Sequence, residues 1–193
     1  MTAARAVAVA ALTVLTVTIG WILFVGLPRW YGGPQPTRTV AATPAPAAPA
    51  PSGRKIKARL FYVSDDGTRL TAVEREVAYG EGTVEQARQI VEAQIAAASD
   101  PLVSAVPPGT KLRSLFVTGR GAAYVDLSRE VASAHSGGSL DEILTVYTIV
   151  NALTENLPAV TSVQVLVDGR EVDTLAGHVD LRRPLARNTS WVQ

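Results

Sequence analysis

A run of 22 residues without a charged side chain, from Ala6 to Leu27, constrains this chain more than any other feature. A helix needs about 20 apolar residues to cross the hydrocarbon core of a bilayer, where its backbone groups bond to one another. Trp21, Trp30 and Tyr31 lie toward one end of the run, and aromatic rings favour the headgroup level. We therefore predict a transmembrane helix over residues 6–27.

A cleavable secretory signal is the alternative interpretation of this run. Such signals have apolar regions of about 7–15 residues, followed by a cleavage site with small residues. The run is longer than that, and the segment from Gly26 to Trp30 is a poor site of this kind. The chain contains no cysteine, which excludes an anchor on a lipid-modified cysteine. The prediction is a retained signal anchor.

Two arguments about the orientation of this anchor oppose each other. Arg5 precedes the run, whereas Arg29 and Arg38 follow it, so a count of basic residues leaves the C-terminal part in the cytoplasm. A five-residue N-terminal tail suits export of the C-terminal part, and long domains translocate largely regardless of their charge. We predict that residues 1–5 form a cytoplasmic tail and that the domain faces outward.

The net charge of +1 hides an uneven distribution of charge along the chain. Residues 1–64 hold seven basic side chains and no acidic one, whereas residues 65–193 carry a net charge of −6. Because a nucleic-acid-binding domain is more often basic, we expect no nucleic-acid partner. The basic segment lies close to the predicted bilayer, where it either meets anionic headgroups or keeps a linker soluble.

A proline-rich segment separates the predicted anchor from the rest of the chain. Six of the twelve prolines fall between Gly33 and Gly53, with alanine in most of the gaps. Proline fixes φ and removes a backbone donor, so residues 28–54 are predicted to be an extended linker. The remaining residues are numerous enough for one domain. We place it at residues 55–185, with a C-terminal tail at 186–193.

Periodicity in this domain predicts an α+β fold with the order β-β-α-β-β-α-β-β and two helices packed on a sheet. Two capping boxes, Thr83 with Gln86 and Ser139 with Glu142, mark the expected helix starts. The dipeptide Asp168-Gly169 is a strong hairpin signal. The strands are expected at residues 56–63, 69–78, 111–118, 122–127, 163–167 and 171–175.

The second helix has a row of apolar residues at helical spacing, which predicts one face buried against the sheet. These residues are Leu140, Ile143, Leu144, Tyr147, Val150 and Leu153.

Residues with catalytic or metal-binding chemistry are sparse. Neither His135 nor His178 has a further ligand at metal-site spacing, and two ligands such as His178 and Asp180 do not make a zinc site. Serines surround His135, but the chain has no G-x-S-x-G nucleophile elbow. We expect no catalytic residue, no metal, no cofactor and no enzymatic activity.

Several short elements in this order and spacing resemble the GerMN domain of sporulation and germination proteins. The resemblance covers about residues 55–184. The chain departs from the family in two respects: Ala152 stands where the family has the first threonine of a Thr-Leu-Thr helix end, and the chain has one copy of the domain where relatives often have two. The resemblance implies an interaction or ligand-binding module in bacterial envelopes, either lipid-anchored or held by one N-terminal helix. The matching elements are Val103–Thr110, Gly121–Ser128, Gly137–Ser139 with Glu142, Val150–Leu157, Val163–Gly169, Gly177–Asp180 and Pro184-Leu185.

Three loops among these elements are candidate interaction sites, because loops on a rigid scaffold often carry recognition. The alternative is that their glycines and prolines only satisfy backbone geometry. The candidate residues are Pro107, Pro108, Gly109, His135, Gly137, Gly138, Ser139, Gly177, His178 and Asp180.

The leading hypothesis is a binding or scaffold module, anchored by one transmembrane helix on the outer side of the bacterial cytoplasmic membrane. The resemblance links it to sporulation, germination or peptidoglycan-associated assembly, with an envelope protein or peptidoglycan as the expected partner. Two alternatives remain open. One is an envelope enzyme acting on peptidoglycan, and the other is a structural subunit that assembles through its sheet edges.

Overall fold

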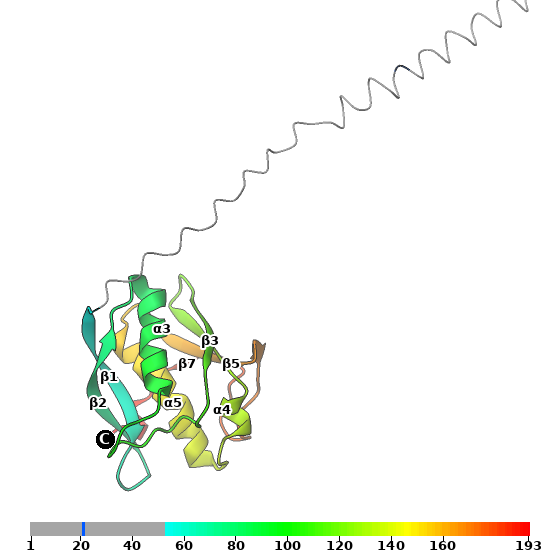
Figure 1. Cartoon of the computed structure of the whole chain (residues 1–193). Coiled ribbons are helices and arrows are strands. Elements are labelled where there is room, and N and C mark those ends of the chain that lie inside the picture. The colour runs from blue at the N-terminus through cyan, green and yellow to red at the C-terminus, as the bar shows by residue number, and fades with distance from the viewer. Residues whose placement is uncertain (1–20, 22–52) are drawn as a thin grey trace, which may run out of the picture. The chain divides into compact units, whose positions relative to one another are not determined.

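Two β-sheets and two long helices make up the part of the chain that the computed structural model describes, which is Trp21 and residues 53–193 (Figure 1). The predicted tail (1–5), the predicted anchor (6–27) apart from Trp21, and the predicted linker (28–54) up to residue 52 lie outside these residues. None of the helices in that described part combines the length and hydropathy that a bilayer-spanning helix needs. The predicted α+β class is confirmed for the described domain, whereas the prediction of a single sheet is wrong, because the strands form two separate sheets.

The first sheet is an antiparallel hairpin of β1 (Lys55–Val63) and β2 (Leu70–Ala78). Both strands were expected from their alternation, and Lys55 pairs with Ala78 at the open end. The connecting turn is held by Asp66, whose carboxylate accepts hydrogen bonds from the Ser64 hydroxyl at 2.6 Å and from the Thr68 backbone N–H at 3.0 Å. These bonds lower the pKa of Asp66 to about 2.

The other edge of β1 is closed by two side-chain carboxamides rather than by a strand. Gln94 accepts from the Phe61 N–H at 2.8 Å and donates to the Phe61 carbonyl at 2.7 Å. Asn156 makes the same pair of bonds with Arg59, both at 2.8 Å. Because each amide offers one acceptor and two donors, it can replace a strand neighbour. The hairpin is therefore joined to a helix at each of these two points.

The second sheet is mixed, with the order β3-β4-β5-β6 and with β7 also paired to β5. The β3–β4 hairpin is antiparallel as predicted, whereas β4 and β5 run parallel. Parallel neighbours need a crossover connection, and the second long helix supplies it. The strands are β3 (Leu112–Val117), β4 (Ala122–Leu127), β5 (Ser162–Val167), β6 (Arg170–Glu171) and β7 (Leu185–Ala186).

Two long helices lie between the sheets in Figure 1, where α3 runs in front of α5. They are α3 (Gly82–Ile95) and α5 (Ser139–Asn156); the short α4 (Glu130–Ser133) and the 3-10 turn η2 (Thr189–Trp191) were not predicted. α5 contacts α3, β1, β5, β7 and η2. It is consequently buried around most of its circumference, and the prediction of a single buried face was too narrow.

Burial along α5 follows from those contacts. Leu144 and Leu153 are buried as predicted, whereas Tyr147 is only partly buried. Polar residues are also enclosed, including Thr148, whose hydroxyl has no partner within the described residues. Helical spacing thus identified part of the core, but it missed the polar residues that α5 buries against other elements.

Both predicted capping boxes are wrong. α3 follows Glu81 and α5 follows Gly138, and neither residue makes a side-chain cap. Gln86 does reach backward, but its amide bonds to the Gly80 N–H at 2.9 Å and the Ala78 carbonyl at 3.2 Å. It therefore holds the β2–α3 connection rather than the helix end.

The predicted last strand at residues 171–175 is largely absent, because β6 ends at Glu171. The Asp168-Gly169 hairpin itself is confirmed, with φ of 50° and 76° at these two residues. Beyond it, the Leu175 N–H bonds to Glu142 at 2.7 Å instead of to a strand neighbour. A loop around this carboxylate replaces the expected strand.

Candidate functional site

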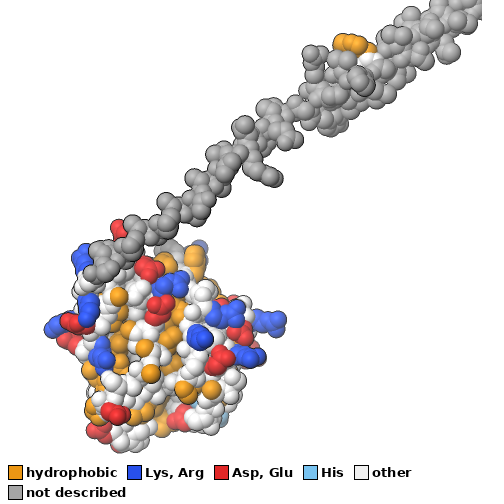
Figure 2. All heavy atoms as spheres, viewed as in Figure 1, with side chains coloured by type: hydrophobic (Ala, Val, Ile, Leu, Met, Phe, Trp, Pro, Cys, Tyr) orange, Lys and Arg blue, Asp and Glu red, His pale blue; other side chains and the backbone are white. Residues whose placement is uncertain are grey.

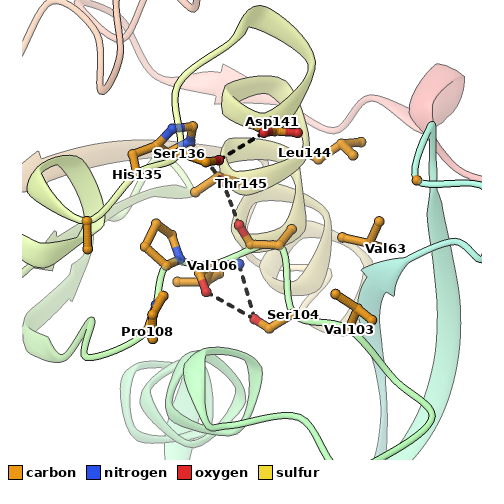
Figure 3. A pocket seen from close by; sticks show the side chains of 14 residues that line it. Val63, Val103, Ser104, Val106, Pro108, His135, Ser136, Asp141, Leu144 and Thr145 are labelled. Carbon is orange, nitrogen blue, oxygen red and sulfur yellow. Dashed lines mark hydrogen bonds between the residues drawn. The ribbon is translucent and has the colours of Figure 1, made fainter.

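A pocket of about 370 Å³ lies between the end of β1, the loop that follows α3, the loop after α4 and the first turns of α5 (Figure 3). It brings together Pro107, Pro108 and His135 from two of the three predicted interaction loops. The described lining residues are Val63, Gly67, Val103, Ser104, Ala105, Val106, Pro107, Pro108, Ala134, His135, Ser136, Asp141, Leu144 and Thr145.

His135 is held in place by hydrogen bonds at both ring nitrogens. Nδ1 accepts the Gly137 N–H at 2.9 Å, so the neutral ring carries its proton on Nε2. Nε2 lies 3.2 Å from the Thr145 hydroxyl, which in turn donates to the Ala105 carbonyl at 2.6 Å. This chain of bonds joins both loops to α5. The imidazole is therefore a fixed part of the wall, with no free lone pair for a proton transfer.

The remaining hydroxyl groups of the pocket are also engaged. The Ser136 hydroxyl donates to Asp141 at 2.9 Å, and the Ser104 hydroxyl accepts the Val106 N–H at 3.1 Å (Figure 3). Ser136 thus bonds to a carboxylate and not to His135, which does not form a serine–histidine pair. The geometry offers a preformed surface for binding and shows no activated nucleophile.

Apolar side chains are accessible within this same pocket. Val103 is 58% exposed although it is a large hydrophobic residue, and it forms an isolated bridge with Val63. The Val63 N–H donates to the Val103 carbonyl at 2.8 Å, so the exposed valine sits on a fixed backbone. Leu144 lies beneath at 2% exposure. Such a combination of apolar wall and a few polar groups is typical of ligand sites.

Two of the predicted loop residues are glycines that the backbone conformation requires. Gly137 and Gly138 have φ of 87° and 88°, a region that side chains with a Cβ rarely adopt. They carry the chain from His135 into α5, with Ser139 as the first helical residue. Neither glycine nor Ser139 lines the pocket, and Gly109 lies beside Pro108 without lining it.

The third predicted loop lies around Glu142 and not at the pocket. The Glu142 carboxylate, at 0% exposure, accepts the backbone N–H groups of Leu175 and His178, both at 2.7 Å. The His178 Nδ1 is 3.2 Å from the same carboxylate. Burial raises the pKa of Glu142, but the surrounding N–H groups outweigh burial and lower that pKa overall. Glu142 is the residue that shapes this loop.

Gly177 and Asp180 lie in this same loop. Gly177 has a φ of 99°, and its N–H donates to the Thr174 hydroxyl at 2.8 Å. Asp180 pairs with Arg182 through bonds of 2.9 and 2.7 Å to the guanidinium, which hold the pKa of Asp180 well below its usual range. Both residues are explained by local bonds.

No group of three or more potential metal ligands occurs among the residues that the structure describes. On the face shown in Figure 2, basic and acidic side chains are interspersed over the domain. The pocket is therefore the candidate site that the described geometry supports best.

Comparison with known proteins agrees with this architecture. The family model "Germane: Sporulation and spore germination" matches residues 59–173. The chain belongs to the Germane family. This confirms the GerMN resemblance, which extends over more than half of the chain. A search of curated proteins finds no significant match.

Three solved structures resemble the Germane domain of this chain. A candidate lipoprotein from Clostridium perfringens shares 24% identity at a TM-score of 0.50, covering 70% of this chain and 89% of that one. The first GerMN domain of GerM from Bacillus subtilis shares 17% sequence identity at a TM-score of 0.52, and the match covers 68% of this chain and 98% of that one. The tandem GerMN domains of the same protein share 16% sequence identity at a TM-score of 0.54, and the match covers 69% of this chain and 46% of that one. At these identities the likeness concerns the fold.

Sequence reasoning missed the roles that Thr145 and Val103 have at the pocket and that Glu142 has in the third loop. Glu142 was assigned to a helix cap, Thr145 was given no role, and Val103 was part of a family element without a stated role. Glu142 binds Leu175, 33 residues away along the chain, and Thr145 binds Ala105, 40 residues away.

Proposed function

We propose that this Germane protein is a membrane-anchored binding module on the outer side of the bacterial cytoplasmic membrane. In this proposal residues 1–5 are cytoplasmic, 6–27 span the membrane, 28–54 form the spacer, 55–185 bind the partner and 186–193 form a tail. The uncharged run before the proline-rich segment supports the anchor. The family description supports a role in spore formation or germination. A role in assembly around peptidoglycan is a second candidate within this proposal and rests on the proposed location in the envelope.

The observation that carries the binding role is the pocket between Pro107, His135 and Asp141. Its imidazole and hydroxyl groups are fixed by bonds to the protein, while Val103 stays exposed. A preformed wall of this kind loses little conformational entropy on binding. The partner in this proposal is an envelope protein or peptidoglycan.

A photo-crosslinking amino acid at Val103 tests this function in intact cells. We expect a crosslinked envelope component that a crosslinker at the exposed Glu171 does not give, because β6 lies outside the pocket. Identical products at the two positions, or none at Val103, would contradict the proposal. Release of labelled fragments from peptidoglycan by the purified chain would instead favour the enzyme hypothesis.

The proposed topology has its own test. Protease added to spheroplasts should digest the domain while a cytoplasmic control protein stays intact. Complete protection of the domain would show that the count of basic residues was the better guide to orientation.

A further inference from the structure

The pocket holds one charged side chain, and that side chain has no basic partner among the described residues. Asp141 is exposed at the pocket, and one of its carboxylate oxygens accepts the Ser136 hydroxyl at 2.9 Å. No ion pair within the described part of the chain includes Asp141, and no described lining residue is Lys or Arg. The site is thus a pocket with an apolar wall, several neutral polar groups and a single negative charge.

We propose that this pocket binds a peptide through a lysine-like side chain, one with an aliphatic stem and a terminal ammonium group. This inference rests on the proposed function and names the chemistry of its ligand. The stem would pack against Val63 and Val103, above the buried Leu144, and the ammonium would pair with Asp141. Long cationic side chains bury their methylene groups on apolar surface while the charge stays at the wet edge.

The arrangement of the pocket in space fits this division of the ligand. In Figure 3 Asp141 and Ser136 lie together on one side, and Val63 lies near Val103 on the other. Their backbones are fixed, since Val63 bridges to Val103 and Asp141 lies in the first turn of α5. A volume of about 370 Å³ is at the small end of ligand pockets, so it suits one side chain with its flanking backbone.

The position of Asp141 in the first turn of α5 offers a purely structural explanation, because a negative charge there interacts favourably with the helix dipole. That explanation predicts a small loss of stability on neutralisation and no effect on ligands. The peptide proposal predicts a loss of binding. The same variant therefore separates the two.

The experiment titrates the purified full-length chain with capped tripeptides and follows backbone amide resonances by NMR. The probe is Ala-Lys-Ala, and the matched probe is Ala-norleucine-Ala, which keeps the aliphatic stem and lacks the ammonium. We expect the lysine peptide to shift the resonances of Ser104, His135 and Thr145. It should bind at least about fivefold more tightly than the norleucine peptide, and more weakly as salt is raised.

Variants assign the two parts of the site. Asp141→Asn keeps an acceptor for the Ser136 hydroxyl and should reduce the affinity for the lysine peptide about fivefold, to that of the norleucine peptide. Glu171→Gln removes an exposed acid elsewhere and should change nothing. Val103→Ser should weaken both peptides. Its side chain is 58% exposed, so the fold should be retained.

Equal affinities for the two peptides, an unchanged affinity in Asp141→Asn, or no shift at the pocket would each overturn the proposal. The proposed binding function can be refuted independently of the cationic ligand. If Val103 crosslinks an envelope component equally in the wild type and in Asp141→Asn, the binding function stands and the cationic ligand is wrong.

Discussion

The Glu142 carboxylate accepts the backbone N–H of His178 at 2.7 Å, although 36 residues separate them. A second bond of 2.7 Å reaches the Leu175 N–H. This buried acid therefore determines the path of the chain after β6. It does so from the helix turn that also carries Asp141, so the loop at residues 175–178 and the pocket depend on the same end of α5.

Replacing Glu142 should be far more damaging than replacing a helix cap. Glu142→Ala leaves two partly buried backbone donors without their acceptor, and each unpaired group costs about 1–3 kcal/mol. We expect the free energy of unfolding to fall by about 3–5 kcal/mol in urea denaturation followed by circular dichroism. Glu171→Ala on exposed β6 is the control and should stay within about 0.5 kcal/mol. A loss near 1 kcal/mol would restore the capping interpretation.

The same carboxylate should make stability depend on acid. Its pKa is lowered in the folded state from an ordinary value of 4.5, so its contribution is present above about pH 4.5 and is lost as the pH falls through the folded pKa. Glu142→Gln removes this contribution. The difference in unfolding free energy between wild type and Glu142→Gln should shrink below pH 4.5, and a difference that grows on acidification would contradict the assignment.

Gln94 should protect the Phe61 amide from solvent. Gln94→Ala leaves the N–H and the carbonyl of a fully buried residue unpaired, which should cost about 2–4 kcal/mol. Hydrogen exchange measures the local effect. The Phe61 amide should exchange much faster in the variant, whereas the Val165 amide in the other sheet should change only as far as global stability does. Unchanged exchange at Phe61 would mean that water or a neighbour replaces the carboxamide.

Leu144 is buried at the start of α5, between the pocket and the core. Leu144→Ala should cost about 2–5 kcal/mol of unfolding free energy, because the cavity it leaves is only partly refilled. Leu140→Ala is the control, since Leu140 is only partly buried and should lose less. Equal losses in the two variants would show that α5 is rotated about its axis relative to this structure.

The two histidines should behave differently. His135→Ala removes the ring that joins Gly137 to Thr145 and should lower partner capture by the pocket. His178→Ala keeps the backbone N–H that Glu142 binds, so stability and capture should stay near those of the wild type. Crosslinking from Val103 in both variants gives the comparison. Normal capture in His135→Ala would move the interface away from this pocket.

Local patterns in the sequence predicted most of the strands and the approximate helix starts, but not the contacts made at the helix starts or the loop that replaces the last strand. The bounds of β4 and the turn at Asp168-Gly169 agree with the structure, because alternation and a two-residue turn are encoded by neighbouring residues. Ser139 with Glu142 matches a capping box equally well, yet Glu142 binds residues more than 30 positions away. Nothing local distinguishes a capping carboxylate from one that holds a distant loop.

The candidate site could be predicted only in part, because local patterns identify loop residues but not which loops meet in the fold. Pro107, Pro108 and His135 lie together as loop residues of one surface, but the grouping with Gly177 and His178 followed only from their place in the family pattern. The amides of Gln94 and Asn156 gave no signal at all. Their role depends on which backbone edge the fold leaves beside them.

The carboxamide bonds to β1 also determine how the domain meets mechanical load. In the proposed topology, any pull between the membrane and the envelope enters the domain at Lys55, the first residue of β1. Along β1, the load first reaches the hydrogen bond between Arg59 and Asn156, then the bond between Phe61 and Gln94, and then the bond between Val63 and the Val103 carbonyl. Tension on the tether is therefore shared among β2, which pairs with β1 along its whole length, α5 and α3 before it arrives at the wall of the pocket.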